Sequence, residues 1–198
     1  MKVDQQTMAA HRAAILKQAG RLFRQHGIDG VAVADITGAA GLTHGAFYGH
    51  FPSKAALAAE ACRLSLERSA EHWRRSIAQA RRDGLDPLTT IVDDYLTPTK
   101  RDQHDRSCAI TTLGHEASRY AEVGPAMGSG VEALLSVLEE LIAERRPNAG
   151  SAAHAEAALA ALAAMNGGLT LARLLAAHPK RSAAALKAAA ALAKRVAD

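Results

Sequence analysis

Apolar residues recur every three or four positions along most of this chain, which is the spacing that places them on one face of an α-helix. The first such segment covers residues 8–26, where Ile15, Ala19 and Phe23 share a face. Gly27 follows at a position where glycine commonly ends a helix, because glycine adopts a left-handed backbone without strain. The pattern therefore predicts a first helix that ends at about residue 26.

Glycine, proline and polar turns divide the rest of the chain into eight further helical segments. Pro52 disfavours helix at the residue before it, and Asp86-Pro87 signals a helix start because aspartate caps a helix and proline suits its first position. We expect a polar loop over residues 100–106, with Ser107 as the cap of the next helix. The predicted segments are residues 33–40, 44–50, 54–82, 87–97, 108–120, 125–146, 151–177 and 182–197.

Composition favours an all-α fold with very little sheet. Apolar residues make up 48% of the 198 residues and aromatic residues only 4%, and alanine, the strongest helix former, is abundant. We expect nine helices, three short ones at the N-terminal end followed by six that are mostly longer.

Cellular location is indicated by what the chain is expected to lack. Its two cysteines are too few for a disulfide framework, and its start lacks the pattern of a signal peptide. No window holds ~18 uninterrupted apolar residues. Residues 152–177 come closest, but strongly polar side chains interrupt them. These are His154, Glu156, Asn166 and Arg173. We expect a cytoplasmic protein without a membrane segment.

Residues 33–51 have the form of a helix-turn-helix, two short helices joined by a turn that contains glycine. Ile36 packs the first helix on its neighbours, Gly41 permits a positive φ in the turn, and Leu42 fills the angle between the helices. Thr43 can cap the second helix, whose N-terminal end meets base edges in such motifs. The residues expected to face outward are Thr43, His44, Gly45 and Tyr48.

This motif and its surroundings resemble the TetR family of bacterial transcriptional regulators. The resemblance covers residues 12–60 and is strongest in His50-Phe51-Pro52-Ser53-Lys54, because the ending Tyr-x-His-Phe-x-x-Lys is highly specific to that family. The resemblance implies an all-helical homodimer. It also implies a DNA-binding domain over residues 1–52 and an effector-binding and dimerisation domain over residues 53–198.

The resemblance implies roles for individual residues as well. Tyr48, His50 and Lys54 match the family's contacts to operator phosphates, and Thr43, His44 and Gly45 lie where its base-reading residues lie. Residues 1–60 hold six basic and four acidic side chains, in a chain whose formal net charge is +4. That balance is compatible with nucleic acid but common elsewhere. Among the basic residues, Lys54 and then Arg12 are the expected phosphate partners.

Two positions depart from the family pattern. Val31-Ala32 stand where the family usually has a hydroxyl residue that caps the second helix and touches phosphate. The loss of a cap typically costs ~1 kcal/mol, so we expect this helix to start less firmly or to borrow another cap. Thr37 replaces the commoner alanine.

Beyond about residue 58 the resemblance concerns architecture alone. Regulators of this family dimerise through their last two long helices, which here are residues 151–177 and 182–197. Their faces of leucine, alanine and glycine would pack into a two-fold four-helix bundle, with a purely intramolecular core as the alternative. The candidate interface residues are Leu159, Leu162, Leu171, Leu174, Leu175, Leu186 and Leu192.

The family's second domain encloses an effector pocket, for which large or polar side chains in an alanine and leucine background are candidates, with ordinary core packing as the alternative. A further hypothesis is that Cys108 is a sensing thiol. In a first helical turn after Ser107, the helix dipole would lower the pKa of its thiol and suit it to sensing oxidants or electrophiles. The simpler interpretation is a small buried residue, which we also expect for Cys62. The candidates are Trp73, Tyr95, Cys108, Met127, Met165 and Asn166.

The sequence therefore predicts a DNA-binding repressor that a small-molecule effector releases from a palindromic operator, and not an enzyme. The nine histidines lack metal-ligand spacing, and no phosphate-binding glycine loop, CxxC pair or G-x-S-x-G motif occurs. We expect no cofactor, metal or catalytic residue. The expected partners are double-stranded operator DNA, an effector and a second copy of the chain. An activator or dual regulator is one alternative. A helical ligand-binding protein with weakened DNA binding is another, for which the missing hydroxyl at position 32 is the hint.

Overall fold

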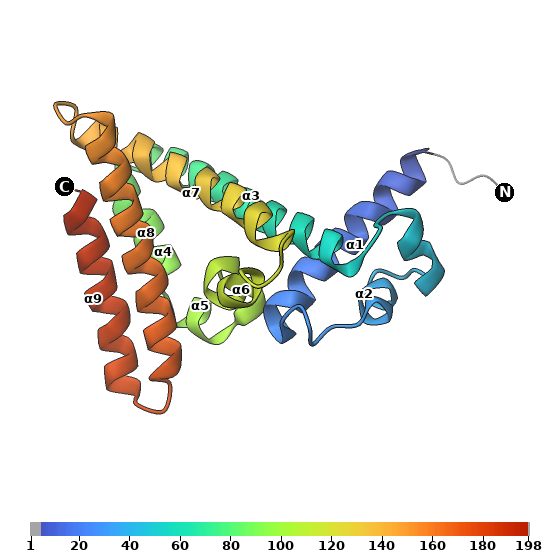
Figure 1. Cartoon of the computed structure of the whole chain (residues 1–198). Helices are drawn as coiled ribbons and strands as arrows, with labels where there is room; N and C mark the ends of the chain where they lie inside the picture. The colour runs from blue at the N-terminus through green and yellow to red at the C-terminus, as the bar shows by residue number, and fades with distance from the viewer. Residues whose placement is uncertain (1–4, 198) are drawn as a thin grey trace.

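The computed structural model describes residues 5–197, and every regular element in that range is helical (Figure 1). Lys2 and Asp4, which enter the charge count above, lie outside the described residues. The expected all-α fold is confirmed, with nine α-helices over residues 5–197. The α-helices are α1 (Gln5–His26), α2 (Val33–Ala39), α3 (Lys54–Arg82), α4 (Pro87–Tyr95), α5 (Pro98–Asp102), α6 (Ala109–Ala117), α7 (Val123–Arg145), α8 (Ser151–Leu174) and α9 (Pro179–Ala197). Two short 3-10 helices complete the set, η1 (His44–Gly49) and η2 (His104–Arg106).

Two elements differ in kind from the prediction. The second helix of the helix-turn-helix, expected over residues 44–50, is the 3-10 helix η1. The loop expected over residues 100–106 is wrong, because α5 and η2 occupy most of it. Thr97 explains α5, since its hydroxyl accepts a hydrogen bond from the backbone N–H of Lys100 at 3.1 Å and Pro98 takes the first position. The sequence pattern predicts only that the preceding helix ends by Pro98.

Helix starts follow the local cap chemistry at three places. Ser53 accepts from the N–H of Ala56 at 2.9 Å, and Asp86 accepts from the N–H of Thr89 at 2.8 Å. The α2 helix borrows a cap, as expected for an alanine at its start. The Asp35 carboxylate accepts from the N–H of Ala32 at 2.9 Å, which satisfies one of the donors left open at a helix start.

Two other expected caps are wrong. Thr43 precedes η1 without a side-chain cap bond. Cys108, not Ser107, stands at the N-cap of α6, and it makes no side-chain cap bond either. The Ser107 hydroxyl is instead a partner of Arg173, which lies 66 positions away in the chain.

The longest helix is α3, with 29 residues, and α7 lies alongside it (Figure 1). The first helix α1 packs on one end of this pair, while α8 and α9 form an antiparallel pair at the other end, with α4 to α6 between them. One apolar core runs through these elements, with the exception of α5, from Ile15 in α1 to Ala197 in α9. The N-terminal helices and the α8–α9 pair therefore lie at opposite ends of a single packed body.

Among residues 5–197, α8 is the one helix that is long and apolar enough to cross a membrane by length and composition alone, with a mean hydropathy of 1.3. Its inner face is fully buried in the chain at Ala158, Ala161 and Leu169, where it packs on α7 and α9. The core of the chain therefore accounts for one face of this helix. Its outer face remains exposed and is described with the site below.

Candidate nucleic-acid interface

The helix-turn-helix is formed by α2, a glycine turn and η1. Gly41 has a φ of +72°, the left-handed conformation that the turn requires. Ile36 and Phe47 are fully buried, and the rings of Phe47 and Phe51 lie 5.8 Å apart between centroids. This apolar base holds η1 against α1 and α2, so the opposite side of η1 is left to face solvent.

The exposed side of η1 carries the residues that the sequence placed outward. Thr43, His44 and Gly45 are exposed, and nothing lies within 4 Å of the position that a Cβ of Gly45 would take. Tyr48 is 64% exposed, although it is one of only three tyrosines in the chain. Its ring meets the ring of His44 edge to face at 5.8 Å and that of Phe47 at 5.2 Å. These ring contacts orient the Tyr48 side chain toward solvent. A phenol hydroxyl in that position can donate a hydrogen bond to a phosphate oxygen.

Lys54 lies at the first position of α3, beside this surface. Its ammonium group donates to the carbonyl oxygen of Val31 at 3.0 Å, and no carboxylate among residues 5–197 pairs with it. An ammonium group has three donors. The single bond to Val31 therefore orients Lys54 and leaves capacity for a phosphate.

Arg12 is already paired within the chain. Its guanidinium makes a two-pronged ion pair with Glu60 at 2.5 Å and lies 4.7 Å above the Phe51 ring. The hydrogen bonding of its guanidinium to the Glu60 carboxylate raises the pKa of Arg12, while burial opposes the rise. With its charge balanced by Glu60, Arg12 offers DNA less than Lys54 does.

His50 ends η1 with its ring edge to face against His11, at 6.2 Å between centroids. Partial burial lowers the pKa of His50 below its usual 6.5, and the nearby His11 and Arg12 lower it further. In the free protein His50 is therefore neutral at pH 7. A phosphate beside it would favour the charged form.

Three side chains join the N-terminal helices to the rest of the molecule. The turn after α1 donates the N–H of Asp29 to Glu116 of α6 at 2.8 Å, and the Asp29 carboxylate accepts from Tyr120. That hydrogen bond raises the pKa of Tyr120 to about 12. Gly27, with a φ of +78°, comes so close to α6 that a Cβ would lie 2.8 Å from a Glu116 oxygen. These partners are about ninety positions apart, and no local pattern in the sequence pointed to them.

Arg24 makes a further junction, between α1 and η2. Its guanidinium donates twice to the carbonyl oxygen of Asp105, at 3.0 and 2.8 Å, and once to the Ser65 hydroxyl of α3 at 2.7 Å. The short segment from α5 to η2 is thus bound directly to the helix that supports the helix-turn-helix.

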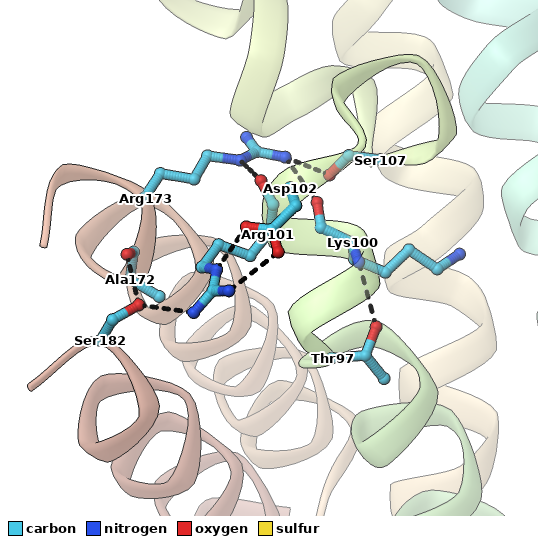
Figure 2. Close-up of polar contacts among 8 residues, drawn as sticks. All are labelled: Thr97, Lys100, Arg101, Asp102, Ser107, Ala172, Arg173 and Ser182. Atoms are coloured by element: carbon cyan, nitrogen blue, oxygen red, sulfur yellow. Dashed lines mark hydrogen bonds and ion pairs between the residues drawn. The ribbon is translucent and has the colours of Figure 1, made fainter. Parts of the chain in front are cut away.

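Figure 2 shows the other side of that segment, where Arg173 reaches from α8 to the end of α5. It donates to the carbonyl oxygens of Lys100 and Arg101 at 3.0 and 3.1 Å, and also to the Ser107 hydroxyl. Carbonyl oxygens at a helix end lack hydrogen-bond donors within the helix, so Arg173 supplies the donors that these carbonyls of α5 need. The sequence signal was available, because Arg173 is one of two charged residues, with Glu156, that interrupt the apolar α8.

The same segment is tied to α9. Arg101 donates to the Ser182 hydroxyl at 3.0 Å, and Ser182 donates to the carbonyl oxygen of Ala172 at 2.7 Å (Figure 2). Residues 97–107 are consequently held by α1 on one side and by α8 and α9 on the other. They form the polar connection between the two ends of the molecule.

The structure brings four of the six effector candidates together. The Tyr95 hydroxyl donates to Asn166 Oδ1 at 2.9 Å, the Trp73 ring lies 6.1 Å from that of Tyr95, and Cys108 lies beside the Tyr95 hydroxyl. Trp73, Tyr95 and Cys108 line a cavity of about 50 Å³. That volume is below the range of roughly 300–1,000 Å³ usual for small-molecule sites.

The two methionines lie elsewhere. Met165 is fully buried in α8, and Met127 lines a separate cavity of about 210 Å³ between α6 and α7. The six candidates therefore do not form one pocket.

Cys108 does not have the chemistry expected of a sensor. Its side chain is buried, and burial raises the pKa of its thiol. Contributions from Tyr95, two backbone N–H groups and Arg173 act in the opposite direction and do not offset it. The expectation of an acidic thiol is wrong because the cysteine points into the core at the start of α6. Cys62 is also buried, and burial raises its pKa to about 11.

The candidate interface leucines divide into two groups. Leu162 and Leu186 are buried within the chain, where they join the α8–α9 core, and Leu175 is half-buried. The other four are among the six most exposed large apolar side chains of residues 5–197. These are Leu159 and Leu171 at 55%, Leu174 at 77% and Leu192 at 40%. All four lie on α8 or α9, which makes an apolar outer face on this helix pair.

The described residues contain no group of three or more histidine, cysteine, aspartate or glutamate side chains that could hold a metal ion.

Comparison with known proteins agrees with this geometry. The family model described as "Bacterial regulatory proteins, tetR family" matches residues 15–61. The chain is 42% identical over 77 residues to the probable HTH-type transcriptional regulator ArpR of Pseudomonas putida. The aligned residues are 39% of this chain. It is 27% identical over 112 residues to the HTH-type transcriptional repressor DhaR of a Mycobacterium species, which covers 57% of this chain. The matched parts span 35% and 54% of those two proteins.

Solved structures share the whole fold. The reduced form of Escherichia coli NemR superposes with a TM-score of 0.76 at 20% identity, over 94% of this chain and 97% of that one. A TetR-family regulator from Cytophaga hutchinsonii has a TM-score of 0.74 at 16% identity, over 98% of each chain. Residues 15–61 therefore match the TetR family of bacterial regulatory proteins, and the chain as a whole has the fold of solved TetR-family regulators.

Proposed function

We propose that this protein is a sequence-specific DNA-binding transcriptional repressor. The observation that carries the proposal is the exposed side of η1, where Tyr48 and His44 project beside the unpaired Lys54. Thr43, His44 and Gly45 would read base edges, and Tyr48, His50 and Lys54 would contact phosphates. Residues 1–52 would then form the DNA-binding domain and residues 53–198 the regulatory domain.

The repressor would act as a two-fold dimer. The exposed leucines of α8 and α9 supply a self-complementary apolar face, and two antiparallel helices from each copy would form a four-helix bundle. A dimer would present two copies of η1 to successive major grooves of a palindromic operator, roughly 34–36 Å apart. The distance between the two copies of η1 would then decide the affinity for DNA.

An effector would act by changing the distance between the two copies of η1. The cavity lined by Trp73, Tyr95 and Cys108 is nearly filled, so a ligand there would have to push α4 and α6 away from α3. Residues 97–107 border this cavity and also bind Arg24 of α1. A ligand that favours the displaced arrangement would lower operator affinity by its difference in affinity for the two states.

The main test of DNA binding compares three variants on DNA from upstream of the protein's own gene. Tyr48→Phe and Lys54→Ala should weaken binding about equally on all sequences, and Lys54→Ala should reduce the salt slope by about one for each subunit's lost phosphate contact. His44→Ala should change which sequences are preferred, by about 1–3 kcal/mol at the affected base pair. Fluorescence anisotropy on the native site and on single-base variants measures both effects. Unchanged binding by all three variants would mean that η1 does not contact DNA.

A second prediction concerns pH. Because the pKa of His50 is lowered in the free protein, and phosphate would raise it in the complex, DNA binding should take up a proton at this residue. The affinity of the wild-type protein should therefore rise as the pH falls from 8 to 6, by at most about tenfold per pH unit for each subunit. His50→Gln should remove this part of the dependence, whereas His44→Gln should leave it in place. An equal pH dependence in wild type and His50→Gln would place His50 away from the phosphates.

A further inference from the structure

A concentration of unbalanced positive charge lies away from the proposed DNA-binding surface of η1. A cavity of about 420 Å³ opens between α1, α3 and η2, at the junction of the N-terminal helices with the rest of the chain. Its volume lies within the range of small-molecule sites. It meets the small cavity beside Tyr95 at Ser107, but its walls come mainly from α1 and α3.

Positive side chains line this cavity from three elements. The single carboxyl group among them is that of Asp105, so the cations exceed the anions by four, as many as the formal net charge of the whole chain. The cations are Lys17, Arg21, Arg24, Arg68 and Arg106.

None of these five cations forms an ion pair with a carboxylate among residues 5–197. Elsewhere on α3, Arg63, Arg74 and Arg81 each lie within ion-pair distance of a glutamate, whereas Lys54 and Arg82 have no carboxylate partner among residues 5–197. The distinguishing feature of this cavity is that five cations without such a partner line one site. Four of the five are exposed, and Arg24 is half-buried. A charge that is partly removed from water without a counterion is unfavourable, and an anion beside Arg24 would relieve this cost and reduce the repulsion among the clustered cations.

Arg24 gives the cavity a fixed donor. Its hydrogen bonds to the carbonyl oxygen of Asp105 and the hydroxyl of Ser65 hold the guanidinium in one place, yet both partners are neutral atoms. Burial lowers the pKa of Arg24, the nearby charge of Arg68 lowers it further, and the Asp105 carboxylate does not offset these effects. Planar guanidinium groups match the oxygens of phosphate in pairs.

We propose that this cavity binds a small anion that carries phosphate groups and at least two negative charges. Arg24 forms the fixed part of the site, and Arg68 and Arg106 close on the ligand from α3 and η2. Because Arg24 and Arg106 belong to the two sides of the α1–η2 junction, the bound anion bridges the helix-turn-helix and the segment held by Arg173. The anion site itself does not depend on the proposed repressor function.

The test is direct binding to the full-length protein by isothermal titration calorimetry at low ionic strength. The first probe is inorganic triphosphate, with sodium sulfate at matched ionic strength as the reference for unspecific attraction. Wild type should bind triphosphate saturably and at least tenfold more tightly than sulfate. A parallel titration with ADP separates the sources of phosphate: tighter binding of ADP indicates an organic phosphate ester, and tighter binding of triphosphate indicates a free oligophosphate. Either order supports the site.

The variant carries Arg68→Gln and Arg106→Gln together. Both side chains are exposed and make no hydrogen bond or ion pair with the described residues, so the fold should be retained, as thermal unfolding would verify. The Kd for triphosphate should rise at least tenfold. Arg75→Gln with Arg82→Gln removes the same charge from exposed positions of α3 outside the cavity and should change the Kd less than twofold.

Three outcomes would overturn the proposal. The first is the absence of saturable binding of both triphosphate and ADP to wild type. The second is an equal loss in the two double variants, which would show attraction by net charge alone. The third is no binding of triphosphate combined with a loss of DNA affinity in the Arg68/Arg106 variant, which would assign these cations to the DNA backbone.

Discussion

Replacing Leu171 with glutamate is expected to convert a dimer into a monomer. Leu171 is 55% exposed and lies one helical turn from Leu174, which at 77% is the most exposed large apolar side chain among the described residues. In the proposed four-helix bundle each copy buries this leucine against its partner. A glutamate there would place two uncompensated charges in the interface, at several kcal/mol in total. The dimer Kd should therefore rise at least a hundredfold, since each 1.4 kcal/mol is a factor of ten.

Analytical ultracentrifugation at micromolar concentration measures this change. Leu85→Glu is the matched control, because Leu85 is 58% exposed but lies in the turn between α3 and α4. It should remain dimeric. A wild-type protein that sediments as a monomer, or equal dissociation of both variants, would contradict the proposed interface. Leu171→Glu should also lose operator binding, because a single helix-turn-helix keeps only half of the contacts.

Gly130→Ala is expected to lower the stability of the fold, although alanine is the better helix former. Gly130 lies where α7 crosses α3, and an added Cβ would lie 2.7 Å from the Cβ of Leu66 and 3.1 Å from the carbonyl oxygen of Arg63. Neither atom can turn away, because both are fixed to the α3 backbone. Overpacking of this kind costs typically 1–3 kcal/mol, which exceeds the ~1 kcal/mol that alanine gains over glycine in a helix.

The control is the same substitution two positions earlier. Gly128 is exposed on the same helix, and nothing lies within 4 Å of the position of its added Cβ. Gly128→Ala should therefore raise the free energy of unfolding by up to ~1 kcal/mol. In thermal unfolding followed by circular dichroism, Gly130→Ala should lower Tm by several degrees and Gly128→Ala should raise it by about 2–4 °C. A rise of Tm in both variants would show that α3 and α7 can separate at little cost.

Much of the fold follows from short-range patterns. The start of α3 at Ser53, the start of α4 at Asp86 and the end of α1 at Gly27 each depend on groups within about four positions in the chain. The helix-turn-helix is equally local, because a few apolar residues and one glycine turn specify it. For these features the sequence pattern was sufficient, and the same applies to the exposed residues of η1.

The candidate effector site could not be derived in this way. Whether Cys108 is an acidic thiol or a core residue depends on what packs over it. Burial raises the pKa of its thiol, although Tyr95 and Arg173 of α8 act in the opposite direction. Likewise Leu162 and Leu174 lie on the same helix and in the same type of apolar pattern, yet Leu162 is buried within the chain and Leu174 is exposed. Periodicity identifies an apolar face but not the element that covers it.

The amino-acid sequence thus accounts for most of the helices, for the caps at Ser53 and Asp86 and for the exposed residues of η1, since these depend on interactions between near neighbours in the chain. Packing in three dimensions accounts for the pairing of Arg12 with Glu60, the contact of Arg24 with Asp105 and the position of Arg173 at the end of α5. Each of these joins residues about 50 to 80 positions apart. Such contacts form only when whole helices meet, so their partners cannot be identified from the residues on either side.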